Sequence, residues 1–172
     1  MAFNSKNIGL VLSGGGSKGI AHAGVIKFLE EQNIKPSIIS GTSAGAIIAA
    51  MYAYGKTPEE ILSFFKSIYF FHWRHFTLKK PGIIDADSFK SYFEIIFGDT
   101  KIGDLEIPVL ITATDLVTGK LKIFKQETKI SDAVLASSSF PGMLSPYKLN
   151  NKIYSDGGIL NHFPTDLVQG RC

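Results

Sequence analysis

The sequence contains almost no cysteine, with Cys172 at the last position as its single example. One cysteine cannot form a disulfide within the chain and has no partner for a cysteine-based metal knuckle. We therefore expect no metal and a reducing, cytoplasmic location. A strong excess of charge is also missing, since 18 basic and 15 acidic residues give a net charge of +3. This small excess does not favour nucleic acid as a partner.

Long apolar runs are absent as well. The apolar run 44–54 is well short of the roughly 20 residues that cross a bilayer. Residues 1–7 are polar and precede only a short apolar run at 8–12, so no secretory signal peptide is expected. Any membrane contact should therefore be peripheral. With 172 residues, 45% of them hydrophobic, the chain can bury one sizeable core, which predicts a single domain over residues 1–172.

Two strand–turn–helix patterns open the chain. The apolar run 8–12 leads into a glycine-rich loop and then into apolar residues at helical spacing over 21–32. The segment 36–40 suits a second buried strand, and the alanine-rich segment 44–54 suits a second helix. This alternation predicts an α/β fold with a mainly parallel central sheet flanked by helices. Functional loops are expected at the carboxyl ends of the strands, where both glycine motifs fall.

The middle of the chain is helical and aromatic. Thr57 and Glu60 have the spacing of a capping box, which predicts a helix that runs to about Ile68. The aromatic-rich stretch 69–76 follows and leaves two interpretations open. It is either a turn that packs in the core, the commoner use of aromatic residues, or a rim that rests on a lipid interface.

The second half predicts a helix, two strands, a helix and a hairpin, at residues 87–97, 108–115, 121–124, 131–137 and 147–154. Asp87 and Ser88 are expected to cap the first of these helices, and Gly98 to stop it. An Asn-Asn turn suits the hairpin, which delivers Asp156 at its end.

Ser43 is the candidate nucleophile. It stands between Gly41 and Gly45, where a predicted strand meets a predicted helix. A nucleophile elbow needs this geometry, because the serine backbone is strained and side chains on either side would collide. The start of the helix also offers free N–H groups and a positive dipole to an anion beside the hydroxyl.

A serine nucleophile also needs donors for the oxyanion that forms on attack. Gly14, Gly15 and Gly16 can turn successive backbone N–H groups toward one point, because glycine accepts the unusual φ angles of such a nest. Lys18, which precedes Gly19, either adds positive charge to this site or is simply a solvated lysine.

The base is less clear from the residues alone. Four histidines are available, namely His22, His72, His75 and His162. His162 follows Asp156 in the order Ser, Asp, His, so a triad that uses it stays open. Asp156 is the sharper candidate, because the two glycines after it, Gly157 and Gly158, permit a close approach to a backbone or a substrate.

Taken together, these motifs resemble those of the patatin-like phospholipase family, the serine acyl hydrolases that work with a Ser/Asp dyad. The matching stretches are the glycine loop 14–19, Gly-x-Ser-x-Gly at 41–45 and Asp-Gly-Gly at 156–158. The segment 136–142 is also similar to the family's Ala-Ser-x-Ala-x-Pro stretch, with Ser139 where alanine is usual. The resemblance covers residue 8 to about residue 164.

The resemblance implies a three-layer fold and a lipid acyl hydrolase without cofactor or metal. Asp156 would be the direct base for Ser43, and Gly14, Gly15 and Gly16 would form the oxyanion loop. The substrate would be a lipid or another fatty-acyl ester. Family domains usually continue past the Asp-Gly-Gly loop with a helix, a strand and more helix, so we expect some C-terminal elements to be missing from these 172 residues.

Two other functions compete with this one. The loop 14–19 also fits the Gly-x-Gly-x-x-Gly pattern of dinucleotide binding, but residues 32–58 contain no acidic residue to bind a ribose. A non-catalytic lipid-binding protein would keep the fold, yet it would have no reason to keep Ser43 and Asp156 in working geometry. The sequence does not choose a head group, an acyl chain, a final acceptor or an oligomeric state.

Overall fold

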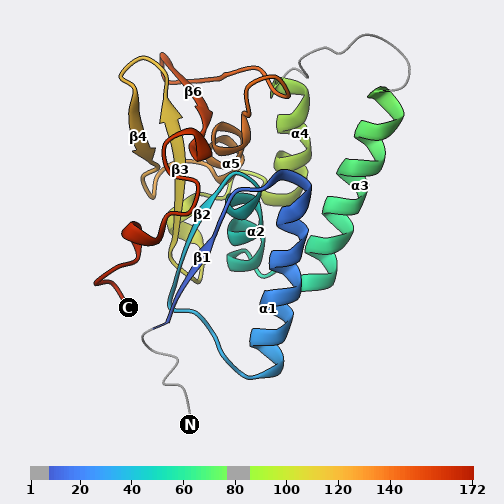
Figure 1. The fold of residues 1–172 in the computed structure, drawn as a ribbon, viewed down its shortest axis with the longest axis vertical. Coiled ribbons are helices and arrows are strands. Elements are labelled where there is room, and N and C mark those ends of the chain that lie inside the picture. The colour runs from blue at the N-terminus through green and yellow to red at the C-terminus, as the bar shows by residue number, and fades with distance from the viewer. Residues whose placement is uncertain (1–7, 77–85) are drawn as a thin grey trace.

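The structure is a computed structural model that describes the backbone of residues 8–76 and 86–172 and the side chains of residues 8–67 and 89–172. Within this part of the chain, six strands form one mixed sheet (Figure 1). β1 (Gly9–Leu12), β2 (Ile38–Thr42) and β3 (Val109–Asp115) are parallel neighbours. β4 (Lys120–Ile123) and β6 (Lys152–Asp156) run antiparallel to β3, and β5 (Tyr147–Leu149) runs antiparallel to β6. The expected α/β class, with parallel core strands, is confirmed.

The ends of β2 and β6 meet on the same edge of β3. Thr112 of β3 pairs with Thr42 of β2 on one side and with β4 on the other. The next residue, Ala113, still pairs with β4, but its second partner is Asp156 of β6. A strand residue has only two sides for pairing, so β6 takes the place of β2 along one edge of β3. The carboxyl ends of these two strands therefore face each other.

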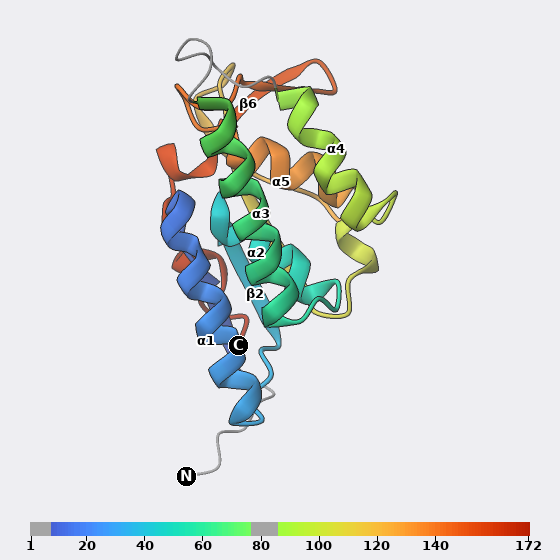
Figure 2. The same ribbon diagram turned by 90° about the vertical axis from the view of Figure 1, so that its right-hand side faces the viewer.

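Five α-helices lie on one side of this sheet in the described part of the chain (Figures 1 and 2). They are α1 (Ala21–Glu31), α2 (Ala44–Ala53), α3 (Pro58–Phe76), α4 (Ala86–Phe97) and α5 (Ile130–Ser138). α2 and α5 pack directly on the sheet, and nearly every residue of both is buried. Their uniformly apolar or small residues are typical of central helices, which have no solvent-facing side.

The other side of the sheet carries the polar side chains of Ser40 and Thr42, which contact a short segment that we call the strap, residues 161–164. Successive strand residues face opposite sides, so Ser40 and Thr42 point away from α2. Ser40 Oγ donates a hydrogen bond to the carbonyl oxygen of Pro164 at 2.9 Å, and Thr42 Oγ1 donates to that of Asn161 at 2.9 Å. Pro164 precedes a 3-10 turn at Thr165–Leu167.

Most predicted boundaries agree with the structure. Thr57 and Glu60 form the expected capping box, with hydrogen bonds of 2.8 and 3.2 Å between each side chain and the other's backbone N–H. Gly98 ends α4 with a φ of +55°. Asn150 and Asn151 form the expected hairpin turn with φ angles of +49° and +61°.

Two predictions for the middle of the chain are wrong. α3 does not stop near Ile68 but continues to Phe76, so the backbone of 69–76 is helical and not a turn. Aromatic residues are only slightly unfavourable in helices, and no glycine or proline interrupts the chain before Pro81. α4 begins at Ala86, which places Asp87 and Ser88 in its first turn and not before it. The side chains of residues 68–88, including the aromatic stretch, lie outside the described residues.

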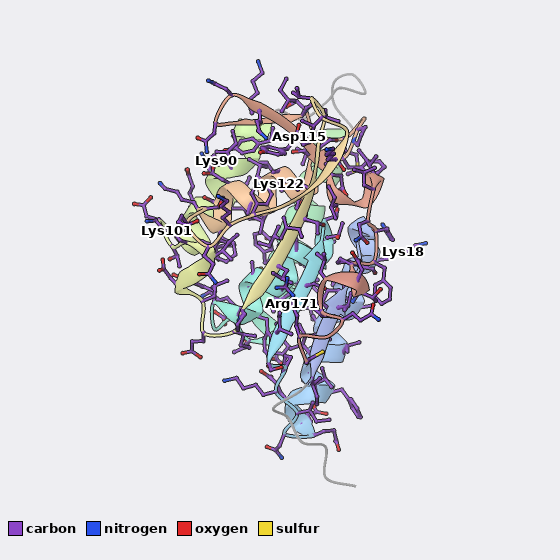
Figure 3. The ribbon with its side chains drawn as sticks, turned by 90° about the vertical axis from the view of Figure 1, so that its left-hand side faces the viewer. Lys18, Lys90, Lys101, Asp115, Lys122 and Arg171 are labelled. Atoms are coloured by element: carbon purple, nitrogen blue, oxygen red, sulfur yellow. The ribbon has the colours of Figure 1, made fainter. Side chains whose placement is uncertain are left out.

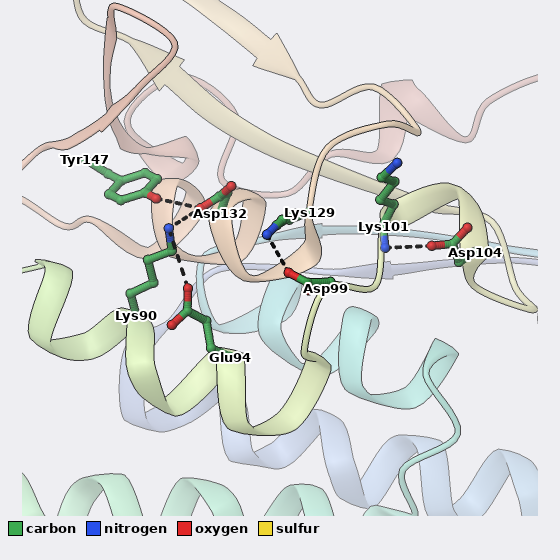
Figure 4. A network of polar contacts seen from close by, with 8 residues as sticks. All are labelled: Lys90, Glu94, Asp99, Lys101, Asp104, Lys129, Asp132 and Tyr147. Atoms are coloured by element: carbon green, nitrogen blue, oxygen red, sulfur yellow. Dashed lines mark hydrogen bonds and ion pairs between the residues drawn. The ribbon is translucent and has the colours of Figure 1, made fainter.

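A polar cluster ties α4 to α5 and β5 (Figure 4). Lys90 Nζ lies 2.9 Å from Asp132 Oδ1, and the Tyr147 hydroxyl donates to the same oxygen at 2.6 Å. The hydrogen bond with Asp132 raises the pKa of Lys90, so its amine stays cationic. Burial raises the pKa of Tyr147 to about 12. The mostly buried Asp132 carboxylate is thus paired with two donors, Lys90 and Tyr147.

In the described residues, no helix combines the length and the apolar character that spanning a membrane requires.

Candidate active site

Ser43 forms a strained turn between β2 and α2. Its φ of +55° and ψ of −124° place a non-glycine residue in a region that side chains rarely adopt. Both flanking glycines are needed because other backbone segments approach their Cα atoms closely. A Cβ at Gly41 would lie 2.6 Å from the carbonyl oxygen of Gly45, and one at Gly45 would lie 2.1 Å from that of Leu12. The Gly-x-Ser-x-Gly pattern therefore forms the elbow that the sequence predicted.

Asp156 is the last residue of β6 and is held on several sides. Its backbone N–H donates to the Ser139 carbonyl at 3.0 Å, and Thr114 Oγ1 donates to its carbonyl at 2.9 Å. Its side-chain Oδ1 accepts the N–H of Gly158 at 2.7 Å. Gly157 allows the turn that follows, because a Cβ there would lie 2.6 Å from Thr112 Oγ1. The carboxylate is thereby fixed in position and nearly inaccessible to solvent.

The two residues are in direct contact. Ser43 Oγ donates a hydrogen bond to Asp156 Oδ2 at 2.6 Å, a distance typical of a charge-assisted bond. Burial raises the pKa of the Asp156 carboxyl, and the bonds from Ser43 and Gly158 and the nearby His162 act in the opposite direction. An aspartate with a raised pKa is a stronger base than a solvated one. Ser43 and Asp156 therefore have the geometry of a nucleophile and its base.

The glycine loop follows β1 and offers fewer free backbone N–H groups than the sequence implied. The Gly14 amide donates to the His162 carbonyl of the strap at 3.0 Å, so it is not available to an oxyanion. The amides of Gly15 and Gly16 have no acceptor within the described residues. Gly15, with a φ of +155°, and Gly16, with a φ of +54°, turn the chain as the nest requires. Of the three amides expected to bind an oxyanion, that of Gly14 is thus occupied, and only those of Gly15 and Gly16 lack an acceptor in the described residues.

Gly19 and Lys18 differ in how they relate to the site. Gly19 is buried against α2, where a Cβ would lie 2.6 Å from the Ala44 Cβ. Lys18 is exposed, lies at the edge of the molecule in Figure 3, and does not line the cavity beside Ser43. Its position fits a solvated lysine.

Of the two histidines whose side chains the structure describes, His162 reaches this site and His22 does not. The His162 ring packs against Gly14 and Gly158, where Cβ atoms would lie 3.0 and 3.1 Å from Nδ1. It lines the cavity, but the hydrogen bond of Ser43 Oγ goes to Asp156. His22 Nε2 instead interacts with the Ser13 carbonyl at 3.1 Å. The side chains of His72 and His75 lie outside the described residues.

α5 supplies contacts that the sequence analysis did not assign. The N–H of Ser43 donates to Ser137 Oγ at 2.8 Å, which fixes the strained elbow. Ser139 Oγ donates to the Leu135 carbonyl at 2.8 Å within the same helix end. The sequence signal for these contacts was the Ala-Ser-Ser-Ser pattern of residues 136–139, which resembles a stretch of the family. The resemblance assigned no role to the individual hydroxyl groups.

Ser43 and Asp156 open into a cavity of about 380 Å³. Its polar lining includes the glycine loop, Ser43, Ser138, Asp156 and His162. The remaining walls are apolar and come from several elements, with side chains from Ala44, Ile47, Phe65, Phe89, Phe140, Met143, Leu144 and Ile159. A nucleophile and base at one end of an apolar cavity suit a ligand that has one polar reactive group and a hydrocarbon part.

Known proteins are similar to this chain in sequence. An uncharacterized NTE family protein of Mycobacterium tuberculosis (strain ATCC 25618 / H37Rv) is 30% identical over 179 residues, which cover 97% of this chain and 47% of that protein. A patatin-like phospholipase domain-containing protein of Caenorhabditis elegans is 30% identical over 96% of this chain and 13% of its own length. The chain thus spans about half the length of the mycobacterial relative.

A solved structure agrees in fold. VipD from Legionella pneumophila superposes with a TM-score of 0.64 at 19% identity, over 92% of this chain and 47% of that one. A family model described as patatin-like phospholipase matches residues 10–168. That match includes all three motifs and nearly the whole chain, so the chain belongs to the patatin-like phospholipase family.

Proposed function

We propose that the chain is a serine lipid acyl hydrolase that cleaves fatty-acyl esters, as a phospholipase A, lysophospholipase or esterase does. Ser43 is the nucleophile and Asp156 is its base. The 2.6 Å hydrogen bond between Ser43 Oγ and Asp156 Oδ2 carries this proposal, because it directs the serine proton to a buried carboxylate. Membership of the family supports the same activity.

In the first step, Ser43 Oγ attacks the ester carbonyl carbon while its proton moves to Asp156 Oδ2. The carbonyl oxygen becomes an oxyanion and accepts hydrogen bonds from the amides of Gly15 and Gly16. The tetrahedral intermediate collapses, the bond to the alkoxy oxygen breaks, and Asp156 returns the proton to the departing alkoxide. An alcohol leaves, and the acyl group remains on Ser43.

In the second step, water attacks the acyl carbon and gives a proton to Asp156, which is again the base. The second oxyanion occupies the same glycine loop. Its collapse breaks the bond to Ser43 Oγ, which recovers the proton from Asp156. The fatty acid is released, and both residues return to their starting state.

The apolar walls support a fatty-acyl substrate. Phe65, Phe89 and Leu144 surround the cavity with hydrocarbon and offer no charged partner. Burial of a methylene group is worth about 0.8 kcal/mol, so such a cavity favours chains of many carbons over short acyl groups. We expect long-chain esters to be hydrolysed with a lower KM than acetate esters.

We also propose peripheral contact with a membrane or micelle through an apolar rim made of Phe140, Met143 and Ile159. These three side chains line the cavity and are 53%, 55% and 48% exposed. Exposed apolar groups around the mouth of a lipid site can enter the lipid surface while the substrate leaves it. The sequence had suggested the aromatic stretch 69–76, with Phe70, Phe71 and Trp73, as one possible rim, but its side chains lie outside the described residues.

Release of fatty acid from a panel of glycerolipids and simple esters tests the proposal. We expect the wild type to release fatty acid, and the Ser43→Ala and Asp156→Asn variants to lose at least about 100-fold in rate. His162→Ala should retain most of the activity, because Asp156 contacts Ser43 directly. If His162→Ala lost activity as fully as Asp156→Asn, in folded protein, a triad would replace the dyad.

A further inference from the structure

The strap is bonded to two separate parts of the candidate site. On one side, the His162 carbonyl accepts the N–H of Gly14 at 3.0 Å. On the other side, Thr42 Oγ1 donates a hydrogen bond to the Asn161 carbonyl at 2.9 Å. Two adjacent carbonyl groups of the strap therefore connect the end of β2, where the nucleophile follows, with the start of the glycine loop.

Thr42 ties the strap to the centre of the sheet. Its hydroxyl has one proton, which goes to the Asn161 carbonyl, so Thr112 Oγ1 is the donor in its 2.7 Å contact with Thr42 Oγ1. Both threonines are buried, and they pair with each other on the parallel strands β2 and β3. Hydrogen bonds in such a chain strengthen one another. Two central strands thus hold the strap in place.

The glycine loop needs an anchor outside itself. Glycine has more conformational freedom than any other residue, and Gly15 and Gly16 have φ angles of +155° and +54°. Among the described residues, a Cβ at Gly15 would meet only atoms of the same loop, and one at Gly16 would meet no heavy atom within 4 Å. Packing against other elements therefore does little to fix the direction of these two amides.

Gly14 is the point where the loop meets both the strap and the nucleophile. A Cβ at Gly14 would lie 2.9 Å from His162 Cε1 and 3.4 Å from Ser43 Cβ. The N–H of Gly14 is the group that the strap holds. The position of Gly14 therefore sets how closely the loop approaches Ser43 and where the amides that follow it point.

We propose that Thr42 is a positioning residue for the oxyanion loop. By fixing the strap, its hydroxyl fixes Gly14, and Gly14 in turn directs the amides of Gly15 and Gly16 toward the oxyanion. This inference rests on the proposed function. Thr42 itself makes no contact with the substrate and exchanges no proton with it, so the products and the proton balance of the reaction are unchanged.

Thr42→Val tests this role, because valine removes the hydroxyl and keeps nearly the same shape. The oxyanion forms only during the reaction, so misdirected amides weaken binding of the transition state and leave binding of the substrate nearly intact. With a soluble ester we expect kcat to fall about tenfold and KM to change less than about twofold. Thr42→Ser keeps the donor and should recover most of the kcat.

Hydrogen exchange of the Gly14 amide, followed by NMR, reports on the strap directly. In the wild type, the bond to the His162 carbonyl should protect this N–H from exchange with solvent. In Thr42→Val we expect exchange at least about tenfold faster, because a strap with one anchor fewer releases Gly14 more often. The Ile39 N–H, which donates to the Pro108 carbonyl at 2.9 Å, reports on opening of the sheet and should change less.

Two further variants separate the strap from effects on neighbouring residues. Ser40→Ala removes the 2.9 Å bond to the Pro164 carbonyl at the far end of the strap, at a residue that does not adjoin the nucleophile. We expect a fall in kcat and faster Gly14 exchange, each of about threefold. Ser37→Ala is the matched control, since it removes a 3.1 Å bond to the Ile8 carbonyl away from the strap. It should change neither quantity by more than about twofold.

The contrary outcomes are distinct. A lower kcat in Thr42→Val with unchanged exchange at Gly14 would overturn the proposal, because the substitution would then act through the adjacent elbow. Faster exchange with the wild-type kcat, or a higher KM at constant kcat, would overturn it as well. So would a Ser37→Ala variant that matches Thr42→Val. Each of these results leaves the hydrolase intact, whereas absence of hydrolysis by the wild type with every ester would reject the proposed function and this role with it.

Discussion

Ser43 and Asp156 are 113 positions apart in the chain, yet Ser43 Oγ donates to Asp156 Oδ2 at 2.6 Å. The contact arises because β2 and β6 share one edge of β3 and meet there end to end. Hydrogen bonds in the sheet thus set the distance between the two side chains. The strap adds a further constraint, since it connects the glycine loop and β2 to the segment after Asp156.

The close approach at Gly45 predicts a large loss of stability on substitution. In Gly45→Ala the new Cβ would lie 2.1 Å from the carbonyl oxygen of Leu12, which belongs to the rigid strand β1. We expect a loss of about 3 kcal/mol in the free energy of unfolding, measured by chemical denaturation.

Gly24→Ala is the control for this substitution. Gly24 lies in α1, and its Cβ would meet no heavy atom within 4 Å outside its own helix and neighbours. This variant should be more stable than the wild type by about 0.5–1 kcal/mol, because alanine is the better helix former. Equal effects of the two substitutions would contradict the packing described for Gly45.

The raised pKa of Asp156 predicts the acid limb of the activity profile. In the proposed mechanism Asp156 must be ionised to accept the proton of Ser43, and burial raises its pKa. The kcat/KM should therefore rise with pH around a midpoint above about 3.9, the ordinary value for aspartate. A midpoint at or below that value, measured with a soluble ester, would exclude Asp156 as the buried base.

The same shift predicts a change in stability with pH. An acid with a raised pKa binds more protons in the folded state, so Asp156 makes folding less favourable as pH rises from about 3.9 through its raised pKa. Asp156→Asn removes this titration. The free energy of unfolding of the variant minus that of the wild type should be more positive at neutral pH than in acid, as measured by denaturation at both pH values. A difference independent of pH would be inconsistent with the shift.

The apolar rim predicts weaker binding to lipid when its side chains become polar. Phe140→Ser and Met143→Ser should each lower the affinity for phosphatidylcholine vesicles about fivefold, as judged by sedimentation. Each substitution removes an apolar side chain that would be partly buried in the lipid surface. Ile95→Ser is the control, since Ile95 is 82% exposed on α4 and does not line the cavity. Equal losses for all three variants would mean that the rim is not the lipid contact.

The cluster around Asp132 predicts that Lys90 contributes to stability. Lys90→Met removes the cation 2.9 Å from Asp132 Oδ1 and leaves a mostly buried carboxylate with Tyr147 as its donor. We expect a loss of about 1–2 kcal/mol in the free energy of unfolding. Lys27→Met breaks the exposed pair with Glu59 and should cause no measurable change. A similar effect of both substitutions would argue against a special role for the cluster.

The sequence predicted the elements and motifs of this chain better than the contacts between them. Glycines at 41 and 45 identify an elbow, because a Cβ at either position would collide with the backbone. The Asn150-Asn151 pair identifies a hairpin turn, because asparagine tolerates the positive φ angles that the turn requires. Helix lengths were less certain, because aromatic residues neither favour nor end a helix strongly. α3 therefore extends past the predicted end.

Long-range contacts carried no local signal. The pairing of Ala113 with Asp156 depends on which strand follows β2 along β3, and no periodicity in the sequence encodes that choice. The bond from the Gly14 amide to the strap likewise changed the expected oxyanion loop.

Covalent labelling with an active-site-directed fluorophosphonate, read by intact mass and peptide mapping, tests the central claim most directly. We predict one adduct on the peptide that contains Ser43, no adduct in Ser43→Ala, and labelling at least about 100-fold slower in Asp156→Asn. An adduct that persists in Ser43→Ala, or labelling of Asp156→Asn at the wild-type rate, would contradict a nucleophile at Ser43 activated by Asp156.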